Sequence, residues 1–525
     1  MKIKKVVLFL VMSTGMVVTP SFAQSNLTKR PNIILFFVDD MGWTDTSVPF
    51  GESPVPNNRK YETPNMQRLA DIGVRFSNAY SHSLCTASRV SLMTGMSSSR
   101  HRVTNWTNST VDRPTDAPYS GMKWPEWNYN GMSTKKEYKN SVIATPLPEL
   151  LRQSGYYTVI VGKGHFAPFG MLASNPEYIG FTEAIASDAT GRPRSYFGTD
   201  NFGNNKPYRY DRGVKGLEAY HGKDIFLTEA LTLEAKRSMD KALNLNTPFF
   251  LYMSHYAVHT PIMEDKRFYQ KYLDSGLDTV EAKYASLVEG MDKSLGDIMD
   301  YVQEKGIANN TIILFMSDNG GLALNPPRGG ELFQQNYPLR SGKGSLYEGG
   351  IREPMIAYWP GVTEAGVVSN QNVIIEDFFP TILEMAGVHD PETVQDIDGV
   401  SFVGNLRNNK LDDTSRSLVW HFPSNWGQGE GTLRKHYKNM KVEELGMGPA
   451  SAIKQGDWKL VYFYGPRKVE LYHVKNDIKE QKDLSKSNPT KARELFLLLT
   501  NMLKDREAQF PFDEKTGQEL RPVWE

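Results

Sequence analysis

Acidic and amide side chains follow two apolar runs of the sequence. Asp39 and Asp40 come directly after NIILFFV, and Asp318 and Asn319 come after TIILFMS. Runs that are apolar throughout are typical of strands buried on both faces of a mainly parallel sheet, and ligands bind beyond the carboxyl ends of such strands. Four oxygen donors that meet there suit a hard cation such as Ca²⁺ or Mg²⁺. Each pair alone is also an ordinary turn sequence, so the prediction requires that the two pairs lie close together in the folded chain.

Basic side chains follow the same kind of apolar run. Lys163 and His165 come after YTVIV, His255 and His259 come after FFLYMS, and Lys343 lies between glycines in RSGKGS. Glycines on both sides let the backbone approach a ligand closely. Taken singly, each of these residues is more simply interpreted as a surface charge or as a histidine that packs in the core. Repeated at strand ends beside a candidate cation site, they predict a pocket for an anionic oxyester.

Cys85 is the only cysteine of the chain and opens the motif CTASRVSLMTG, four residues ahead of Arg89. It cannot form a disulfide within the chain, and a lone thiol in an exported protein invites oxidation. A buried small hydrophobe is the ordinary alternative for a free cysteine. The residue therefore has either a chemical role or a packing role.

The first residues have the pattern of an export signal. Three early lysines precede an apolar run and a small-x-small site that ends at Ala23, which predicts a cleaved signal peptide over residues 1–23. The apolar run is too short for a membrane span, and we expect no membrane anchor elsewhere. An uncleaved anchor is the alternative interpretation.

Charge and length restrict the class of protein. The chain has 60 basic and 60 acidic residues, and without the signal the balance becomes slightly acidic. Nucleic-acid-binding proteins normally carry a basic excess, so we expect no nucleic-acid partner. The 525 residues exceed one ordinary core, so we expect one large domain and one smaller domain.

Apolar runs alternate with amphipathic segments along most of the chain. Apolar residues at helical spacing predict helices from Pro64 to Gly73 and over residues 225–243 and 279–305. This order predicts an α/β fold, in which helices sandwich a large mixed, mainly parallel sheet. The predicted strands are Asn32–Val38, Tyr157–Val161, Phe249–Ser254, Thr311–Met316 and Pro354–Trp359.

The pattern of predicted elements changes toward the C-terminus. Short strand-like pieces and a helix near Ala492–Asp505 predict a smaller α+β subdomain over residues 412–525, after a large domain over residues 24–411. Residues 100–145 and 185–222 are rich in glycine, asparagine, proline, tyrosine and charge. They predict long surface loops, which in a compact domain are usually functional or mobile.

Together these segments closely resemble the type I sulfatases, the formylglycine-dependent members of the alkaline-phosphatase superfamily. The resemblance extends from about Arg30 to about Ser485. It implies an alkaline-phosphatase-like fold, a sulfuric ester hydrolase, and a catalytic domain over residues 24–411. The motifs that carry it are RPNIILFFVDDMGWTD, ETPNMQRLADIGVRFSNAYSHSLCTASRVSLMTG, GYYTVIVGKGHF, PFFLYMSHYAVHTP, TIILFMSDNGG and LRSGKGSLYEGGIREPMI.

The resemblance implies a nucleophile and a metal site. In that family the motif cysteine is converted to formylglycine (3-oxoalanine), which here is Cys85. Its hydrate acts as the nucleophile, and one hydrate oxygen binds the metal. The remaining metal ligands correspond to Asp39, Asp40, Asp318 and Asn319, and the usual ion is Ca²⁺, one per chain.

The resemblance also implies roles for the basic residues. Arg89 supports the formylglycine and its developing charge, and Lys163 and Lys343 hold sulfate oxygens. His259 or Lys343 protonates the departing alkoxide, because alcohols are poor leaving groups. His165 takes a proton from the second hydroxyl of the hydrate, so that the C–O bond to sulfate breaks and the aldehyde is restored.

One position departs from many relatives. The third motif position is Ala87, where many relatives carry proline. Maturation enzymes differ in how well they accept alanine there. A formylglycine-generating maturation enzyme is an expected partner, and the substitution bears on which system acts.

The resemblance is to bacterial members that desulfate polysaccharides. With the export signal, it implies an enzyme of the periplasm, or alternatively a secreted one, that acts on sulfated polysaccharide-derived oligosaccharides. Packing between the two domains is the alternative for the two tryptophans among the candidates for sugar contact. These candidates are Arg100, His101, His255, Trp420, His421 and Trp426.

Two other functions fit parts of the pattern. A phosphoester or phosphonate hydrolase of the same superfamily would differ in its relative rates on matched sulfate and phosphate esters. A non-catalytic sulfated-glycan binding protein would keep Cys85 as an unmodified thiol.

Overall fold

The structure is a computed structural model that describes residues 30–136, 138–205, 213–323, 328, 334–427 and 445–524. The predicted signal peptide over residues 1–23 lies outside these ranges. None of the helices within them has the length and apolar character required to cross a bilayer.

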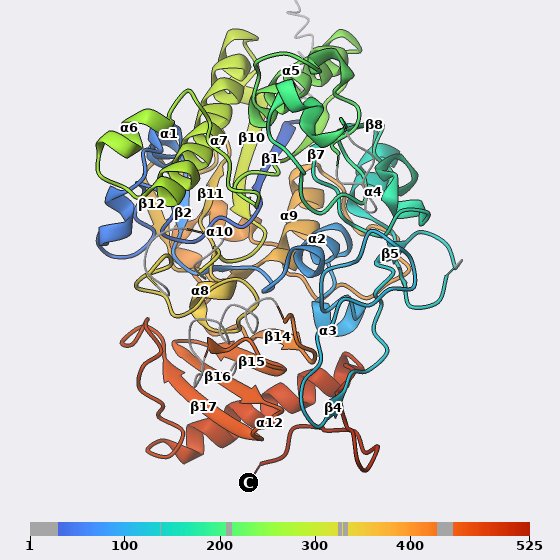
Figure 1. The fold of residues 1–525 in the computed structure, drawn as a ribbon, viewed down its shortest axis with the longest axis vertical. Helices are drawn as coiled ribbons and strands as arrows, with labels where there is room; N and C mark the ends of the chain where they lie inside the picture. Colours follow the sequence, from blue (N-terminus) through green and yellow to red (C-terminus); the bar gives the residue numbers. More distant parts are fainter. Residues whose placement is uncertain are drawn as a thin grey trace, which may run out of the picture.

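An eight-stranded mixed sheet forms the centre of the molecule (Figure 1). Its five adjacent strands β10, β1, β9, β7 and β8 are parallel, whereas β11 is antiparallel to both of its neighbours. The prediction of a mainly parallel sheet is therefore confirmed. In order across the sheet the strands are β12 (Val367–Ser369), β2 (Val74–Phe76), β11 (Met355–Tyr358), β10 (Thr311–Ser317), β1 (Asn32–Val38), β9 (Phe249–Ser254), β7 (Tyr157–Gly162) and β8 (Glu183–Ile185).

Strand β1 shows why the predicted strands are apolar at every position. Leu35 and Phe37 point to one core cluster, whereas Ile34 and Phe36 point to a second cluster on the opposite face. Side chains alternate along a strand, so a strand covered on both faces needs apolar residues at odd and even positions alike.

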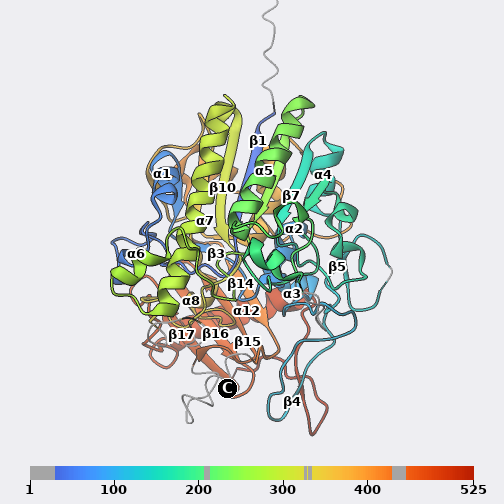
Figure 2. The ribbon, with the colours of Figure 1, turned by 45° about the horizontal axis from the view of Figure 1, so that its top comes forward.

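Helices cover both faces of the sheet, and Figure 2 shows α5 and α7 running along one of them. The predicted helix starting at Pro64 ends one residue before Gly73, as expected. On one face lie α1 (Pro64–Ile72), α5 (Leu227–Asn244) and α7 (Thr279–Glu304), and on the other α2 (Cys85–Thr94), α4 (Leu147–Gln153) and α9 (Phe378–Met385).

Shorter elements connect these layers. The remaining helices of the large domain are α3 (Ser98–His101), α6 (Tyr269–Asp274), α8 (Glu348–Ile351) and α10 (Val403–Arg407), with 3₁₀ turns η1 (Pro56–Arg59), η2 (Leu172–Ser174), η3 (Pro176–Ile179), η4 (Gly198–Gly203), η5 (Glu218–Tyr220), η6 (Ala308–Asn310), η7 (Ile375–Asp377) and η8 (Asn409–Leu411). Small paired strands are β3 (Ala79–Tyr80) with β13 (Val373–Ile374), β5 (Met132–Ser133) with β6 (Val142–Ile143), and β4 (Met122–Lys123) with β18 (Phe512–Asp513).

A four-stranded antiparallel sheet forms the C-terminal subdomain, at the bottom of Figure 1. One of its faces packs on α12, and Trp420 on the other face belongs to the core cluster of the large domain. The predicted α+β subdomain is confirmed, while its boundary at residue 412 stays a prediction. Its elements are β14 (Leu418–Phe422), β15 (Ala450–Gln455), β16 (Trp458–Phe463), β17 (Lys468–His473) and α12 (Pro489–Asp505).

The two segments predicted as surface loops are only partly at the surface. Most of their described residues lie outside long helices and strands, as expected. However, Val103, Trp127 and Met132 of the first segment and Tyr196 and Phe202 of the second are buried in the core clusters. Isolated apolar residues without a regular period gave no sequence signal of this burial.

A group of buried ion pairs joins the two sheets, and we call it the inter-sheet cluster (Glu348, Arg352, Lys459 and Glu480). Lys459 Nζ donates to Glu348 Oε1 at 2.9 Å and lies 2.8 Å from Glu480 Oε1. Glu480 Oε2 accepts the Glu348 backbone N–H at 2.7 Å, and Glu348 Oε2 lies 3.2 Å from Arg352 and accepts from the Tyr80 hydroxyl at 3.0 Å. Each carboxylate oxygen of the cluster therefore contacts a cation or a donor, although Glu480 Oε1 makes only the ion pair with Lys459 and no hydrogen bond.

Candidate active site

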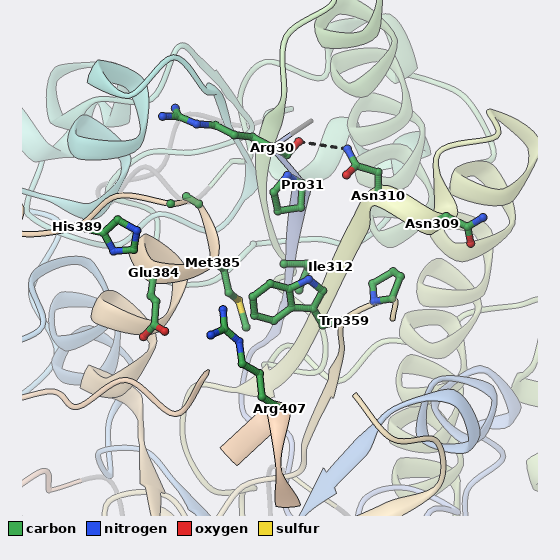
Figure 3. Close-up of a pocket in the computed structure, with 13 residues that line it drawn as sticks. Arg30, Pro31, Asn309, Asn310, Ile312, Trp359, Glu384, Met385, His389 and Arg407 are labelled. Carbon is green, nitrogen blue, oxygen red and sulfur yellow. Dashed lines mark hydrogen bonds between the residues drawn. The ribbon is translucent and has the colours of Figure 1, made fainter. Parts of the chain in front are cut away.

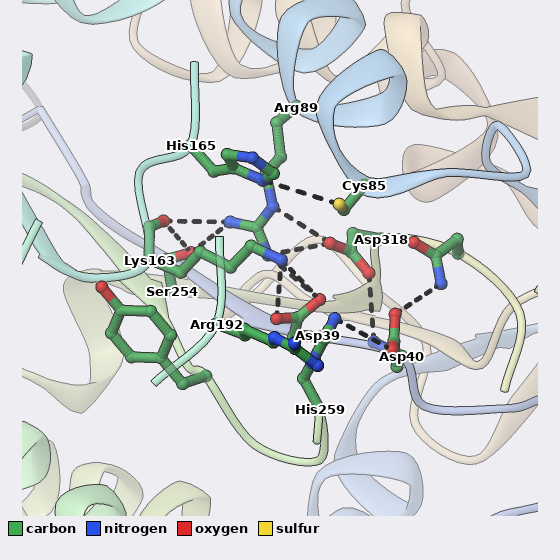
Figure 4. Close-up of polar contacts among 12 residues, drawn as sticks. Asp39, Asp40, Cys85, Arg89, Lys163, His165, Arg192, Ser254, His259 and Asp318 are labelled. Carbon is green, nitrogen blue, oxygen red and sulfur yellow. Dashed lines mark hydrogen bonds and ion pairs between the residues drawn. The ribbon is translucent and has the colours of Figure 1, made fainter. Parts of the chain in front are cut away.

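The ends of two adjacent parallel strands bring four oxygen-bearing side chains together (Figure 4). Val38 at the end of β1 pairs with Ser317 at the end of β10, so the next residues, Asp39 and Asp318, leave the sheet side by side. The Asp40 backbone N–H donates to Asp318 Oδ1 at 3.1 Å, and Asn319 Nδ2 donates to Asp40 Oδ1 at 2.8 Å. We call Asp39, Asp40, Asp318 and Asn319 the oxygen cluster.

Two oxygens of the oxygen cluster are left over. Asp40 Oδ2 and Asn319 Oδ1 are buried and accept no hydrogen bond from the described residues. A buried oxygen without a donor is costly unless a cation or water takes its place. Carboxylate and amide oxygens are the ligands that a hard divalent cation prefers, and ligand atoms of Asp39, Asp40 and His259 lie within 4.8 Å of one another. The residues present therefore fit such a cation.

Two lysines lie on the carboxylates of the oxygen cluster. Lys163 Nζ is 2.9 and 2.7 Å from the two oxygens of Asp39, and Lys343 Nζ donates to Asp40 Oδ1. Burial raises the pKa of Asp39 well above its ordinary value, although Lys163 opposes the shift. Burial also acts on Asp40, but His259 and Lys343 outweigh it and lower its pKa. Burial works against the ammonium of Lys343, yet the charge of Asp40 raises its pKa.

Cys85 is the first residue of α2, and Arg89 lies one turn further along the same helix. Arg89 Nε donates to Asp318 Oδ2 at 3.0 Å, and its Nη1 donates to the Lys163 carbonyl at 2.9 Å and to Ser254 Oγ at 2.7 Å. Figure 4 shows Cys85, Arg89 and His165 on one side of the oxygen cluster and His259 on the other. Helix α2 therefore presents the thiol beside the cluster.

His165 has a defined tautomer. Its Nε2 lies 2.9 Å from the Thr107 carbonyl, which only accepts, so Nε2 carries the proton. Nδ1 is then an acceptor, 3.6 Å from Cys85 Sγ and 3.4 Å from the Thr86 hydroxyl. Burial, followed by the charge of Lys163, lowers the pKa of His165 to about 3. A neutral imidazole with a free lone pair thus faces residue 85.

His259 faces the oxygen cluster from the loop after β9. Its Nδ1 lies 3.0 Å from the Thr260 carbonyl and therefore carries the proton, so Nε2 directs its lone pair toward Asp40 Oδ2 at 3.4 Å. Burial lowers the pKa of His259 well below its ordinary value, against the attraction of Asp40. Two acceptors facing each other leave room for a cation or a proton between them.

Two of the predicted sugar contacts are committed to the protein itself. Arg100 donates to both oxygens of Asp398, at 2.9 and 3.0 Å. His101 is fully buried, where Nε2 meets the Ser91 hydroxyl at 2.9 Å and Nδ1 accepts the Val103 N–H at 3.0 Å. Neither residue has a hydrogen bond or ion pair with the oxygen cluster in the described part of the chain.

The other two predicted histidines are also core residues. His255 is fully buried against Phe36, with ring centroids 4.9 Å apart. His421 has its ring nitrogens 2.7 Å from the Ser451 hydroxyl and 2.7 Å from the Gln509 carbonyl. The side chains of Arg100, His101, His255 and His421 are thus buried or paired within the protein, and sugar contact by them stays a prediction.

The two tryptophans predicted as sugar contacts lie in different places. Trp420 is buried and donates its indole N–H to the Ser81 carbonyl at 2.8 Å, so it packs the two domains together. Trp426 lies at the site, with Lys343 Nζ 5.9 Å from its ring centroid.

The sequence analysis missed residues that surround the site. Ser254, the last residue of β9, accepts from Arg89, and the carbonyl of Thr107 fixes the tautomer of His165. Arg192, drawn beside His259 in Figure 4, donates to the Thr260 hydroxyl at 3.3 Å. Ser254 was detectable, because it precedes His255 at a strand end and must face the opposite side. The two loop residues carried no such signal.

Comparison with known proteins shows that the chain is similar in sequence to sulfatases. The sulfatase family model matches residues 31–388, and the model described as N-sulphoglucosamine sulphohydrolase, C-terminal, matches residues 342–509. A sulfatase of Formosa agariphila is 30% identical over 96% of this chain and 93% of its own length. Human N-acetylgalactosamine-6-sulfatase is 33% identical over 74% of this chain and 68% of its own length.

Solved structures extend this result to the fold. The crystal structure of Ps i-CgsB in complex with k-i-k-neocarrahexaose has a TM-score of 0.68 and 27% identity, and covers 93% of this chain and 96% of that chain. The phosphonate monoester hydrolase of Agrobacterium radiobacter has a TM-score of 0.58 at 18% identity, over 91% of this chain and 96% of that chain, and shares the fold alone. The predicted family and fold class are confirmed.

Proposed function

The chain belongs to the sulfatase family, and we propose that it is an exported enzyme that hydrolyses sulfate monoesters on sulfated oligosaccharides. The observation that carries the proposal is the meeting of Cys85, the oxygen cluster and three basic side chains at adjacent strand ends. Such a site combines a position for a nucleophile with positive charge for the transferring sulfuryl group, which is usually the largest contribution to catalysis.

Cys85 is the position of the nucleophile, after conversion of its thiol to the formylglycine aldehyde by a maturation enzyme. When hydrated, the aldehyde supplies one hydroxyl that attacks sulfur and a second whose deprotonation releases sulfate. Support comes from the burial of Cys85 at the start of α2, with Arg89 and His165 directed to the same place. A thiol that served packing alone would need neither of them.

The oxygen cluster would hold Ca²⁺ together with an oxygen of residue 85. The ion would supply positive charge that eases ionisation of a hydroxyl group at that residue. The unpartnered oxygens of Asp40 and Asn319 support this assignment.

Three cations of the chain bind the sulfate group. Arg89 is fixed by Asp318 and by the Lys163 carbonyl, so its guanidinium is oriented before substrate arrives. Lys163 and Lys343 each have three donors, of which the carboxylates use only part. The remaining donors are available for sulfate oxygens.

Two proton transfers complete the reaction. His165 Nδ1, the unprotonated nitrogen, accepts the proton from the group at residue 85 that expels sulfate. Lys343 is the group that carries a proton for the departing sugar alkoxide, because Asp40 raises its pKa and keeps it charged, whereas burial lowers the pKa of His259 and leaves that imidazole neutral. His259 then hydrogen-bonds the leaving oxygen and holds it in place.

Sulfated carbohydrate is the proposed substrate class. The names of two relatives support it, since one acts on N-acetylgalactosamine 6-sulfate and another was crystallised with an oligosaccharide, neocarrahexaose. The export signal predicted from the sequence places the reaction outside the cytoplasm, and we propose the periplasm.

Mass spectrometry of native-host protein tests the nucleophile. We expect the peptide spanning Tyr80–Arg89 to have lost sulfur and two hydrogens and gained one oxygen at Cys85. Sulfate release from a panel of defined sulfated oligosaccharides, compared with phosphate release from matched phosphate esters, tests the reaction. An unmodified thiol in active protein would overturn the formylglycine assignment, and faster phosphate release would overturn the sulfatase reaction.

A further inference from the structure

A cavity lies at the end of the sheet opposite the oxygen cluster (Figure 3). Pro31 precedes β1 and Asn310 precedes β10, the same strands whose other ends carry Asp39 and Asp318. A strand of seven residues spans about 23 Å, so the cavity is remote from the oxygen cluster. Its volume of about 460 Å³ lies within the range of small-molecule sites.

The floor of this cavity is apolar and contains a flat aromatic surface. Figure 3 shows the indole of Trp359 between Met385 and Ile312. Trp359 is only partly buried, so part of its ring is open to solvent. A rigid amphipathic ring of this kind contributes a large contact area for the C–H face of a sugar.

The rim of the cavity carries cations. The Arg407 guanidinium lies 5.8 Å from the Trp359 ring centroid, and the residue is exposed. Its guanidinium has no hydrogen bond or ion pair with any residue that the structure describes. His389 is a second exposed basic side chain at the rim. A free guanidinium beside an aromatic face can bind two oxygens of a sulfate group at once.

The acidic residue in the cavity wall has a hydrogen-bond partner within the protein. Glu384 accepts a hydrogen bond from the Ser401 hydroxyl at 2.6 Å. Arg30, the other cation in the wall, donates to the Ser154 carbonyl. Arg407 is therefore the cation of the wall whose guanidinium has no partner among the described residues, next to the ring on which a sugar would stack.

We propose that this cavity is a second, non-catalytic binding site for a sulfated glycan. It holds one sulfated sugar unit, with the ring on Trp359 and the sulfate on Arg407. The proposal rests on the proposed function, because it takes the same class of substrate. A polymer held at this site stays near the enzyme, which raises the effective concentration of its other units at the oxygen cluster.

Affinity electrophoresis tests the site with the full-length protein. Gels contain κ-carrageenan or chondroitin sulfate, and matched gels contain agarose or unsulfated chondroitin. We expect retardation of the wild type in at least one sulfated gel, and a dissociation constant raised about fivefold by Trp359→Ala and by Arg407→Ala. Arg493→Ala, which removes an exposed cation from α12, is the matched control and should migrate as the wild type does.

Turnover separates this proposal from the proposed function. Both variants should release sulfate from a small aryl sulfate at the wild-type rate, because the cavity is remote from Cys85. Arg407→Ala leaves the partly buried Trp359 in place and so keeps the test valid if Trp359→Ala fails to fold. Wild-type protein that no sulfated gel retards, or an Arg407→Ala variant retarded as strongly as the wild type, would overturn the second site. Absence of sulfate release by the wild type from every sulfated oligosaccharide of the panel would instead overturn the proposed function.

Discussion

The inter-sheet cluster and the oxygen cluster are both buried groups of opposite charges, and they differ in one respect. In the inter-sheet cluster each carboxylate oxygen lies within 3.2 Å of a cationic nitrogen, a backbone N–H or a hydroxyl, although Glu480 Oε1 makes only an ion pair, with Lys459. In the oxygen cluster the carboxylates also meet lysines and an arginine, yet Asp40 Oδ2 and Asn319 Oδ1 accept no hydrogen bond. Every carboxylate oxygen of the first cluster has a close contact with a cation or a donor of the chain, whereas the second cluster has coordination capacity left over.

This difference separates a structural charge group from a functional one. Burying charges is expensive, and a buried ion pair is stabilising only when hydrogen bonds satisfy its remaining atoms. The inter-sheet cluster comes close to that condition, since Glu480 Oε1 is its one carboxylate oxygen without a hydrogen bond and that oxygen lies 2.8 Å from Lys459 Nζ, and the cluster ties α8 to β16. The oxygen cluster does not meet it alone, so we expect loss of function from changes at the oxygen cluster and loss of stability from changes at the inter-sheet cluster.

The largest effect is expected from Cys85→Ala, beside the oxygen cluster. We expect sulfate release to fall by at least about 10³-fold, since a covalent nucleophile is removed. The free energy of unfolding should change by less than about 1 kcal/mol, because the side chain loses a single atom. Initial rates on an aryl sulfate and urea unfolding measure the two effects. Residual turnover near the wild-type rate would remove Cys85 from the mechanism.

Lys459→Met makes the opposite change at the inter-sheet cluster. Two buried glutamates lose their shared cation, and we expect the free energy of unfolding to fall by about 3–5 kcal/mol. Lys468→Met is the matched control, because Lys468 is exposed and its partner Glu470 keeps hydrogen bonds from Tyr347 and Tyr472, so the change should cost less than about 1 kcal/mol. Chemical denaturation of both variants measures the difference. Equal stability of the two variants would contradict the stabilising role of the inter-sheet cluster.

A smaller effect is expected from pH. Burial, aided by Glu348 and opposed by Lys459, raises the pKa of Glu480 to about 7, from an ordinary value of 4.5. Between these values the folded protein keeps a proton that the unfolded chain has released, so its stability falls as pH rises. Glu480→Gln holds no such proton, and its stability should depend less on pH over this window. Urea unfolding at about pH 5 and about pH 8 measures both proteins, and identical pH dependence would contradict the shift.

The central strands were predictable from sequence because burial on both faces leaves an unbroken apolar run. The run at residues 354–359 predicted β11 equally well, but nothing in it showed that β11 is antiparallel to β10. The direction of a strand depends on the path by which the chain returns to the sheet. Here that path runs through segments whose apolar residues have no regular spacing. The burial of Trp127 in such a segment was unpredictable for the same reason.

The same distinction applies to the site. Residues directly after β1 and β10 met as expected, because the register of two parallel strands carries over to the next residue. His255 also follows a strand, yet it packs on Phe36. Ser254 faces Arg89, and side-chain alternation turns the next residue to the other side of the sheet. Position at a strand end therefore predicts proximity to a site, and alternation decides which side chain enters it.

Calorimetric titration of chelator-treated protein with Ca²⁺ tests the central claim most directly. We expect binding of one ion per chain, weaker binding by Asn319→Ala, which lacks one of the unpartnered oxygens, and wild-type binding by Glu480→Gln. Absence of binding, or equal affinity in Asn319→Ala, would contradict the assignment of the oxygen cluster as a cation site.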